Sequence, residues 1–307
     1  MVFMGLFSAV SVGRLNFAAA LLHAAQAVIV LVIVCWQDDK PLTSDMAAWG
    51  GGARPGHFTL ERIARVWSAN GTIGAVTVPS GVIDVRVLMI VFFALSAMFQ
   101  GTASAFMEGR SGNLRYLEYS LTSALMILAI AVEAGIRDVY ALVCMFVLLW
   151  VTQLTGIVAE LYSHDSRAPW GWLPPHLVGW VTFVAAYAPI LDSFLLCNSH
   201  SERQAPGFVR ALVLVEFLLF ACFGIVQGYC LAAKAWLPLA AGYGSVGPPS
   251  PMSMIISDAE GGVGGPVPDN TDPAEAIDLD GEGAFIVLSL AAKTSLAWII
   301  LAPALLA

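Results

Sequence analysis

Near the end of the chain, residues Ala284–Leu306 read AFIVLSLAAKTSLAWIILAPALL. The run is mostly apolar and Lys293 is its one charged residue. It is long enough to cross a hydrocarbon layer of about 30 Å as a helix. At a rise of about 1.5 Å per residue, Lys293 would lie near the middle of that helix, too deep for its amine to reach either membrane face easily. A charge at this depth costs about 2.5–3.5 kcal/mol on insertion scales, so Lys293 is a candidate functional residue.

The composition of the whole chain agrees with a membrane protein. Of the 307 residues, 58% are hydrophobic and 12% are charged, whereas soluble domains carry roughly a quarter charged residues. The net charge of -8 would repel nucleic acid. The sequence has no nucleophile–base pair, phosphate-binding loop or metal-ligand cluster, so we expect no enzyme, no metal and no nucleic-acid partner.

Seven stretches are long and apolar enough to span a bilayer. They are Leu15–Trp36, Val85–Phe106, Leu114–Ala134, Val139–Leu161, His176–Leu196, Phe208–Ala233 and Ala284–Leu306. Short alternating segments of about ten residues, which are typical of membrane barrels, do not occur. The sequence predicts an all-α bundle of seven transmembrane helices, forming a single membrane domain over residues 1–307.

Two connections are long. Residues 37–84 contain a Val76-Thr77-Val78 stretch before Pro79, which predicts a short β-hairpin capping one mouth of the bundle. Residues 241–283 are rich in Gly and Pro. The chain has eight acids and no Lys or Arg between Ala235 and Glu282. We expect this second segment to be a mobile, solvated loop.

The basic residues do not orient the bundle. Equal numbers lie toward the two sides, with Arg14, Arg110, Arg115, Arg167 and Lys234 on one and Lys40, Arg86, Arg137, Arg203 and Arg210 on the other.

Two carboxylates accompany Lys293 within apolar spans. Glu118 follows Arg115 by three residues, so the two can pair on one helix face, or Glu118 can balance the charge on Lys293. Glu216 lies deep in the sixth span, where it can be a protonated hydrogen-bond donor between helices or part of a proton path. Lys293 itself can form a structural ion pair or react with an aldehyde as a Schiff base.

Together these residues resemble the retinal-binding microbial rhodopsins, and most specifically the heliorhodopsin family. The resemblance rests on a lysine in the seventh helix, on Arg115-x-x-Glu118 in the third, and on the Glu118-Tyr119-Ser120 run. Ser289, one turn before Lys293, stands where ordinary pumps carry a second carboxylate. His23 and Gln26 share one face of the first helix.

The resemblance implies a role for each matching residue. Lys293 would carry all-trans retinal as a protonated Schiff base, and Glu118 would be its counterion. Ser289, Ser120 and Arg115 would lie around that pair, and His23 and Gln26 would line a polar cavity. The retinal pocket would include Tyr119, Thr122, Trp180, Phe183, Tyr187, Phe217 and Phe220.

The function expected from the resemblance is a light sensor that relays a conformational signal and does not pump ions. One alternative is a light-gated or light-driven proton or cation conductor. Another is a retinal-free receptor or transporter in which Lys293 and Glu118 only pair. The resemblance also implies a homodimer in the bilayer with the N-terminus in the cytoplasm, so that the acidic segment can meet a cytoplasmic protein partner.

Overall fold

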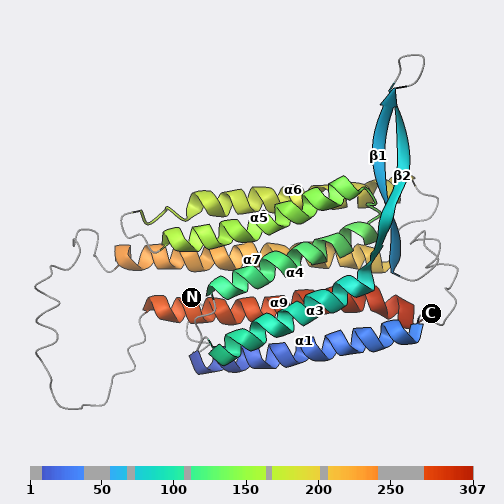
Figure 1. Ribbon diagram of the computed structural model, residues 1–307. Coiled ribbons are helices and arrows are strands. Elements are labelled where there is room, and N and C mark those ends of the chain that lie inside the picture. The colour runs from blue at the N-terminus through green and yellow to red at the C-terminus, as the bar shows by residue number, and fades with distance from the viewer. Residues whose placement is uncertain are drawn as a thin grey trace, which may run out of the picture.

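The computed structural model describes residues 9–37, 56–67, 73–106, 112–163, 168–200, 207–240 and 273–306. Within these ranges, seven helices are long and apolar enough to cross a membrane, which confirms the predicted bundle. They are α1 (Ala9–Gln37), α3 (Val85–Phe106), α4 (Gly112–Glu133), α5 (Val139–Ser163), α6 (Leu173–His200), α7 (Gly207–Ala240) and α9 (Pro273–Leu306). Figure 1 shows them lying side by side along one direction.

The third predicted span, α4, lies at the centre of the bundle. It packs against α3, α5, α7 and α9, while α9 also returns to pack against α1. Of the α4 span, 78% is buried, against 22% of the α1 span. Small residues such as Ala124, Ala129 and Ala131 are fully buried on α4, and they let neighbouring helices approach closely.

The last helix begins earlier than the sequence analysis expected. It starts at Pro273, because proline has no backbone N–H to leave unpaired at the first helical position. Residues 273–283 are therefore helical, and the expectation of a solvated loop is wrong for Glu282, which is 7% exposed. The rest of that expected loop, 241–272, lies outside the described residues.

The predicted hairpin is present and is longer than expected. Strand β1 (His57–Trp67) pairs antiparallel with β2 (Ile73–Asp84), with an irregularity between Leu60 and Glu61 opposite Pro79. Figure 1 shows the root of the hairpin against one end of the helices and the rest of both strands projecting beyond the bundle.

The root of the hairpin is fixed to the helices. The backbone N–H of Glu61 donates to the carbonyl of Arg137 at 2.9 Å, and the Arg137 guanidinium lies 4.2 Å from the centre of the Phe58 ring. The side chain of Arg86 donates to Asp84 at 3.0 Å. These contacts join the hairpin to the start of α3 and to the turn between α4 and α5.

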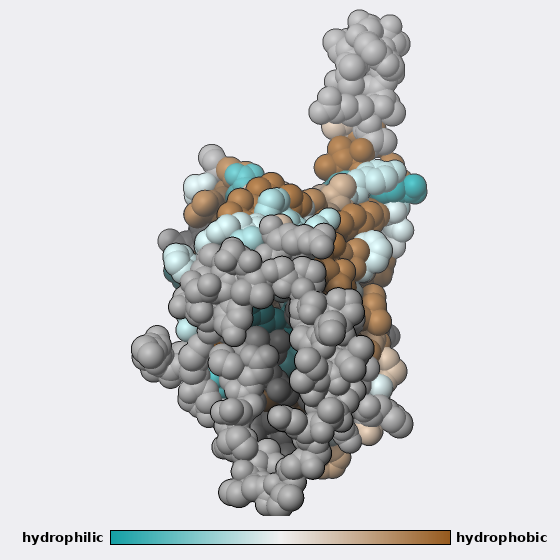
Figure 2. All heavy atoms as spheres, turned by 90° about the vertical axis from the view of Figure 1, so that its left-hand side faces the viewer, coloured by the Kyte–Doolittle hydropathy of each residue, from teal (hydrophilic) through white to brown (hydrophobic). Residues whose placement is uncertain are grey.

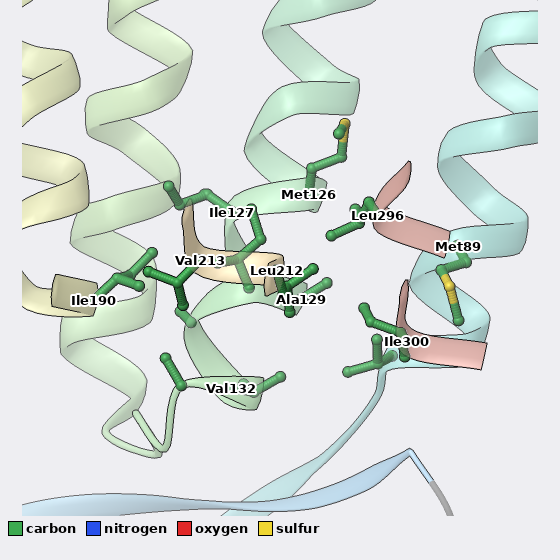
Figure 3. Close-up of a cluster of buried hydrophobic side chains, with 14 of the residues drawn as sticks. Met89, Met126, Ile127, Ala129, Val132, Ile190, Leu212, Val213, Leu296 and Ile300 are labelled. Carbon is green, nitrogen blue, oxygen red and sulfur yellow. The ribbon is translucent and has the colours of Figure 1, made fainter. Parts of the chain in front are cut away.

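The interior of the bundle has an apolar half and a polar half. The main apolar cluster lies toward the hairpin end, and Figure 3 shows part of it, including Met126, Ile127, Leu212, Leu296 and Ile300. Toward the opposite end, the buried side chains include Asn16, His23, Ser96, Gln100, Arg115, Glu118 and Glu282. Figure 2 faces that end and shows hydrophilic residues inside the bundle and hydrophobic residues along its flank. Lys293 lies where the two halves meet.

Candidate functional site

A buried ion pair joins α9 to α4. The Lys293 Nζ atom lies 2.7 Å from the Glu118 Oε1 atom, and the two side chains are 2% and 4% exposed. Lys293 also donates to the Ser289 hydroxyl at 2.7 Å, because Ser289 lies one turn earlier on the same helix face. Two charges buried together with good geometry compensate much of each other's desolvation cost, whereas either alone would destabilise the fold.

The polar residues after Glu118 mostly bond to their own helix. Ser120 donates to the Leu117 carbonyl at 2.9 Å, so the structure does not bring its hydroxyl to Lys293 as expected. Thr122 donates to the Glu118 carbonyl at 3.0 Å. Tyr119 instead reaches α9, where its hydroxyl donates to the Phe285 carbonyl at 3.0 Å, and its ring centre lies 5.2 Å from the Lys293 Nζ atom.

Arg115 does not pair with Glu118, although one turn of helix separates them. Its guanidinium lies 2.5 Å from Glu282 on α9 and 3.4 Å from Glu160 on α5. Lys234 on α7 lies 4.0 Å from the other oxygen of Glu160. Arg115 therefore links α4 to two other helices and leaves Glu118 to Lys293.

A second polar group approaches Lys293 from α1. Gln26 donates to the hydroxyl of Thr294 at 2.8 Å, and its carbonyl oxygen lies 3.3 Å from the His23 Nδ1 atom. Through these contacts His23 and Gln26 lie beside the residue that follows Lys293, but neither of them lines the cavities at Glu118 and Lys293. Ser96 and Gln100 on α3 are also buried on this side, and the sequence analysis did not single them out.

Two adjoining cavities, which share several lining residues and together form one elongated space, run from Lys293 toward α5 and α6. The first part of this space is lined by Lys293, Ser289, Thr122, Tyr119 and Phe220. Its second part shares Tyr119, Gln153, Phe220 and Phe223 with the first and continues to Trp180, Phe183, His176 and Gln227. The cavity therefore has a basic amine at one end, aromatic walls, and a more polar far end.

Two glycines let aromatic side chains that line the far part of the cavity pack directly against the backbone of neighbouring helices. A Cβ atom on Gly156 would lie 2.8 Å from the Tyr116 ring, and one on Gly224 would lie 2.8 Å from the Trp180 ring. Real Cβ atoms do not approach other atoms so closely, so any larger residue would displace these aromatic side chains. Neither glycine was identified from the sequence.

The comparison with protein families agrees with this geometry. The heliorhodopsin family model matches residues 12–237. The chain belongs to the heliorhodopsin family. None of the curated proteins searched matches it.

The heliorhodopsin family consists of light-sensing membrane proteins that bind retinal, and the seven apolar helices make this member an integral, multi-pass membrane protein. The matched range ends before α9, so the assignment of Lys293 rests on its own position.

The residues present fit retinal. A heliorhodopsin needs an amine that can condense with the aldehyde and an apolar, elongated space for the polyene, and the cavity offers both. Of the expected pocket residues, Tyr119, Thr122, Trp180, Phe183 and Phe220 line it. The other two, Tyr187 and Phe217, do not line the cavity. Their rings pack against the ring of Phe183, and the ring centres of Phe183 and Phe217 are 5.6 Å apart in a stacked arrangement.

Glu216 lies in the apolar half. Its Oε1 atom accepts a hydrogen bond from Ser295 at 2.7 Å, and its Oε2 atom is buried with no hydrogen-bond partner among the described residues. Glu216 does not contact the Lys293–Glu118 pair. It is therefore a separate buried carboxyl group between α7 and α9.

Proposed function

We propose that Lys293 holds retinal covalently as a protonated Schiff base, and that Glu118 is the counterion. The observation that supports this most directly is the 2.7 Å pairing of the two groups at the mouth of an aromatic cavity. The nitrogen that pairs with Glu118 is the atom that would carry the Schiff-base proton, so a cation is already compensated at this position.

A bound retinal would supply the absorption of visible light and a light-driven isomerisation. The residues around it would stabilise the positive charge on the Lys293 nitrogen. Glu118 balances this charge, Ser289 accepts a hydrogen bond from the same nitrogen, and the Tyr119 side chain forms part of the cavity wall. Because the site is buried and mostly apolar, water is kept from the carbon–nitrogen bond, which protects the linkage from hydrolysis.

The chain acts as a sensor that relays a conformational signal, and it does not pump ions. A pump needs proton acceptors and donors on both sides of the Schiff base. The buried polar side chains gather mainly on one side of Lys293, while the other side is occupied by the main apolar cluster, among which Arg86, Glu133 and Glu216 are the buried charged side chains described. Ser289 also stands where a second carboxylate would accept a proton.

The deciding experiment is a visible spectrum of the purified protein with all-trans retinal, before and after illumination with hydroxylamine. A visible band that bleaches with hydroxylamine supports the Schiff base. If no band forms, Lys293 and Glu118 are a structural ion pair only.

A light-gated proton or cation conductor is the second candidate, and Glu216 favours it. A buried carboxyl group with one unpartnered oxygen among the described residues can accept or pass a proton within the apolar half. Photocurrent in a voltage-clamped cell separates the two functions. A current that disappears in Glu216→Gln supports conduction, and the absence of current in the wild-type protein supports the sensor.

The resemblance also supports a homodimer with a cytoplasmic N-terminus and a cytoplasmic protein partner. The hairpin carries the exposed apolar side chains of Val76 and Val78 on one face, which a second copy would cover. Replacing Val76 and Val78 with Thr should weaken the dimer, as measured by cross-linking in membranes.

The orientation and the partner need separate tests. A cysteine added after Met1 reports the orientation of the N-terminus through its labelling by a membrane-impermeant reagent. Affinity capture with the 241–272 segment as bait tests for the protein partner.

A further inference from the structure

A small cavity connects the counterion to the charged cluster at the end of the bundle. Glu118 and Glu282 both line it, together with Arg115, Asn16 and Gln100. Its lining comes from α1, α3, α4 and α9, whereas the chromophore cavity is lined from α4, α5, α6, α7 and α9. Neither the retinal pocket nor the pairing of Glu118 with Lys293 requires this space.

Gln100 indicates that the cavity holds water. Its side chain belongs to a residue that is 2% exposed, and neither amide atom has a hydrogen-bond partner among the described residues. Asn16, on the facing helix, is 4% exposed. A buried amide without a protein partner, such as that of Gln100, is normally satisfied by internal water, which binds where several polar groups face one space.

Arg115 lies between two carboxylates at the far end of this cavity. It is 2.5 Å from Glu282 and 3.4 Å from Glu160, and the guanidinium keeps its charge throughout. The side chain of Glu282 is 9% exposed, whereas that of Glu160 is 26% exposed and also lies near Lys234. If Glu282 became neutral, Arg115 would still have Glu160 as its partner.

We infer that Glu282 is a second proton-accepting carboxylate, reached from Glu118 through water bound by Gln100 and Asn16. Protonation of Glu282 weakens its pair with Arg115 and shifts the guanidinium toward Glu160. The inference rests on the proposed function, because it takes the proton from the nitrogen of Lys293.

The transfer balances without any further reactant. The Lys293 nitrogen loses its proton to Glu118, and the cation and the carboxylate become neutral together. The proton then passes from Glu118 through the bound water to an oxygen of Glu282, which restores the carboxylate at Glu118. The positive charge that leaves Lys293 thus arrives beside Arg115, where α4, α5 and α9 meet.

Light-minus-dark infrared difference spectroscopy of the retinal-bound protein tests the proton acceptor. A positive C=O stretch from a newly protonated carboxyl group is expected in the wild type and should disappear in Glu282→Gln. Glu160→Gln is the matched control, since Glu160 binds the same arginine but does not line the cavity. A band that is unchanged in Glu282→Gln, or lost equally in Glu160→Gln, overturns the inference.

Gln100→Leu tests the route while leaving the ion pairs in place. The rise of the carboxyl band should slow at least tenfold, whereas Gln153→Leu, which removes an amide from the chromophore cavity, should not slow it. Equal rates in Gln100→Leu and the wild type overturn the route.

An experimental density map provides a readout that does not depend on light. At least one ordered water should bond to the Gln100 amide between Glu118 and Glu282, and a map without water there overturns the hydrated route. A wild-type protein without a visible band would overturn the proposed function as well, whereas a coloured protein with an unaffected carboxyl band overturns this inference alone.

Discussion

Gln26 on α1 donates a hydrogen bond of 2.8 Å to the hydroxyl of Thr294, the residue that follows Lys293 on α9. The contact joins the first and last helices of the bundle beside the candidate attachment site. Because Gln26 also contacts His23 at 3.3 Å, one amide side chain fixes both the α1 polar face and the position of Thr294.

Gln26→Leu should lower the thermal stability of the protein without abolishing its colour. The loss of one partly buried hydrogen bond typically costs about 0.5–1.5 kcal/mol. Thermal bleaching of the visible band measures the effect. Thr102→Val is the control, because the Thr102 hydroxyl is exposed and donates to the Met98 carbonyl of its own helix. Equal bleaching temperatures for the two variants would contradict the prediction.

Glu118→Gln should shift the visible band to longer wavelength, because the ground-state cation at Lys293 loses its anion. For the same reason the Schiff base should lose its proton at a lower pH than in the wild type. A pH titration of the visible spectrum measures both effects. An unchanged band and titration would assign the counterion to another group.

Lys293→Ala should give colourless protein with all-trans retinal and should also destabilise the fold. It leaves Glu118 buried without its cation, and breaking a buried pair from one side costs about 3–5 kcal/mol. The double variant Lys293→Ala with Glu118→Gln should recover most of that loss, as measured by thermal unfolding. Arg14→Ala, at an exposed position, is the control, and a double variant no more stable than the single one argues against the pairing.

Gly224→Ala should reduce the yield of coloured protein. The new Cβ atom would lie 2.8 Å from the Trp180 ring, so that ring must move into the cavity. Gly13→Ala on α1 meets nothing within 4 Å and should instead stabilise the helix by about 0.5–1 kcal/mol. Visible absorbance per mole of purified protein compares the two, and equal yields would place the chromophore elsewhere.

Deletion of residues 245–270 should leave the visible band intact, because α9 begins at Pro273 and carries Glu282, Ser289 and Lys293. A deletion extended through Glu282 should lower stability, since Arg115 then loses its 2.5 Å partner. Loss of colour in the shorter deletion would show that the removed segment is structural.

The seven helices could be predicted from the sequence, and so could the need of Lys293 for a charged partner, because both follow from the distribution of apolar residues. Apolar runs of about 20 residues identify spans, and a charge at the centre of such a run requires a partner. Lys293 and Glu118 are in fact partners at 2.7 Å. The hairpin was also visible, since its β-branched residues lie before Pro79 in an otherwise loop-like segment.

That Arg115 pairs with Glu282 could not be predicted from the sequence. Glu282 belongs by composition to an acidic run, and only the extension of α9 to Pro273 brings it into the bundle. Helical spacing placed Glu118 near Arg115, but tertiary packing gave each residue a different partner. Gln153 and His176 line the cavity from helices whose sequences do not indicate which face is inward.

The division of the interior into an apolar and a polar half has an electrical consequence. In a membrane, most of the transmembrane voltage falls across the region of low dielectric constant, and about 2.3 kcal/mol per 100 mV is gained or lost by a charge that crosses all of it. A proton that moves from Lys293 to Glu282 travels eleven residues along α9, about 16 Å at 1.5 Å per residue, and therefore crosses a substantial part of that field. The yield of the proton transfer should therefore change with membrane potential, so that a cell would read light and its own energetic state together.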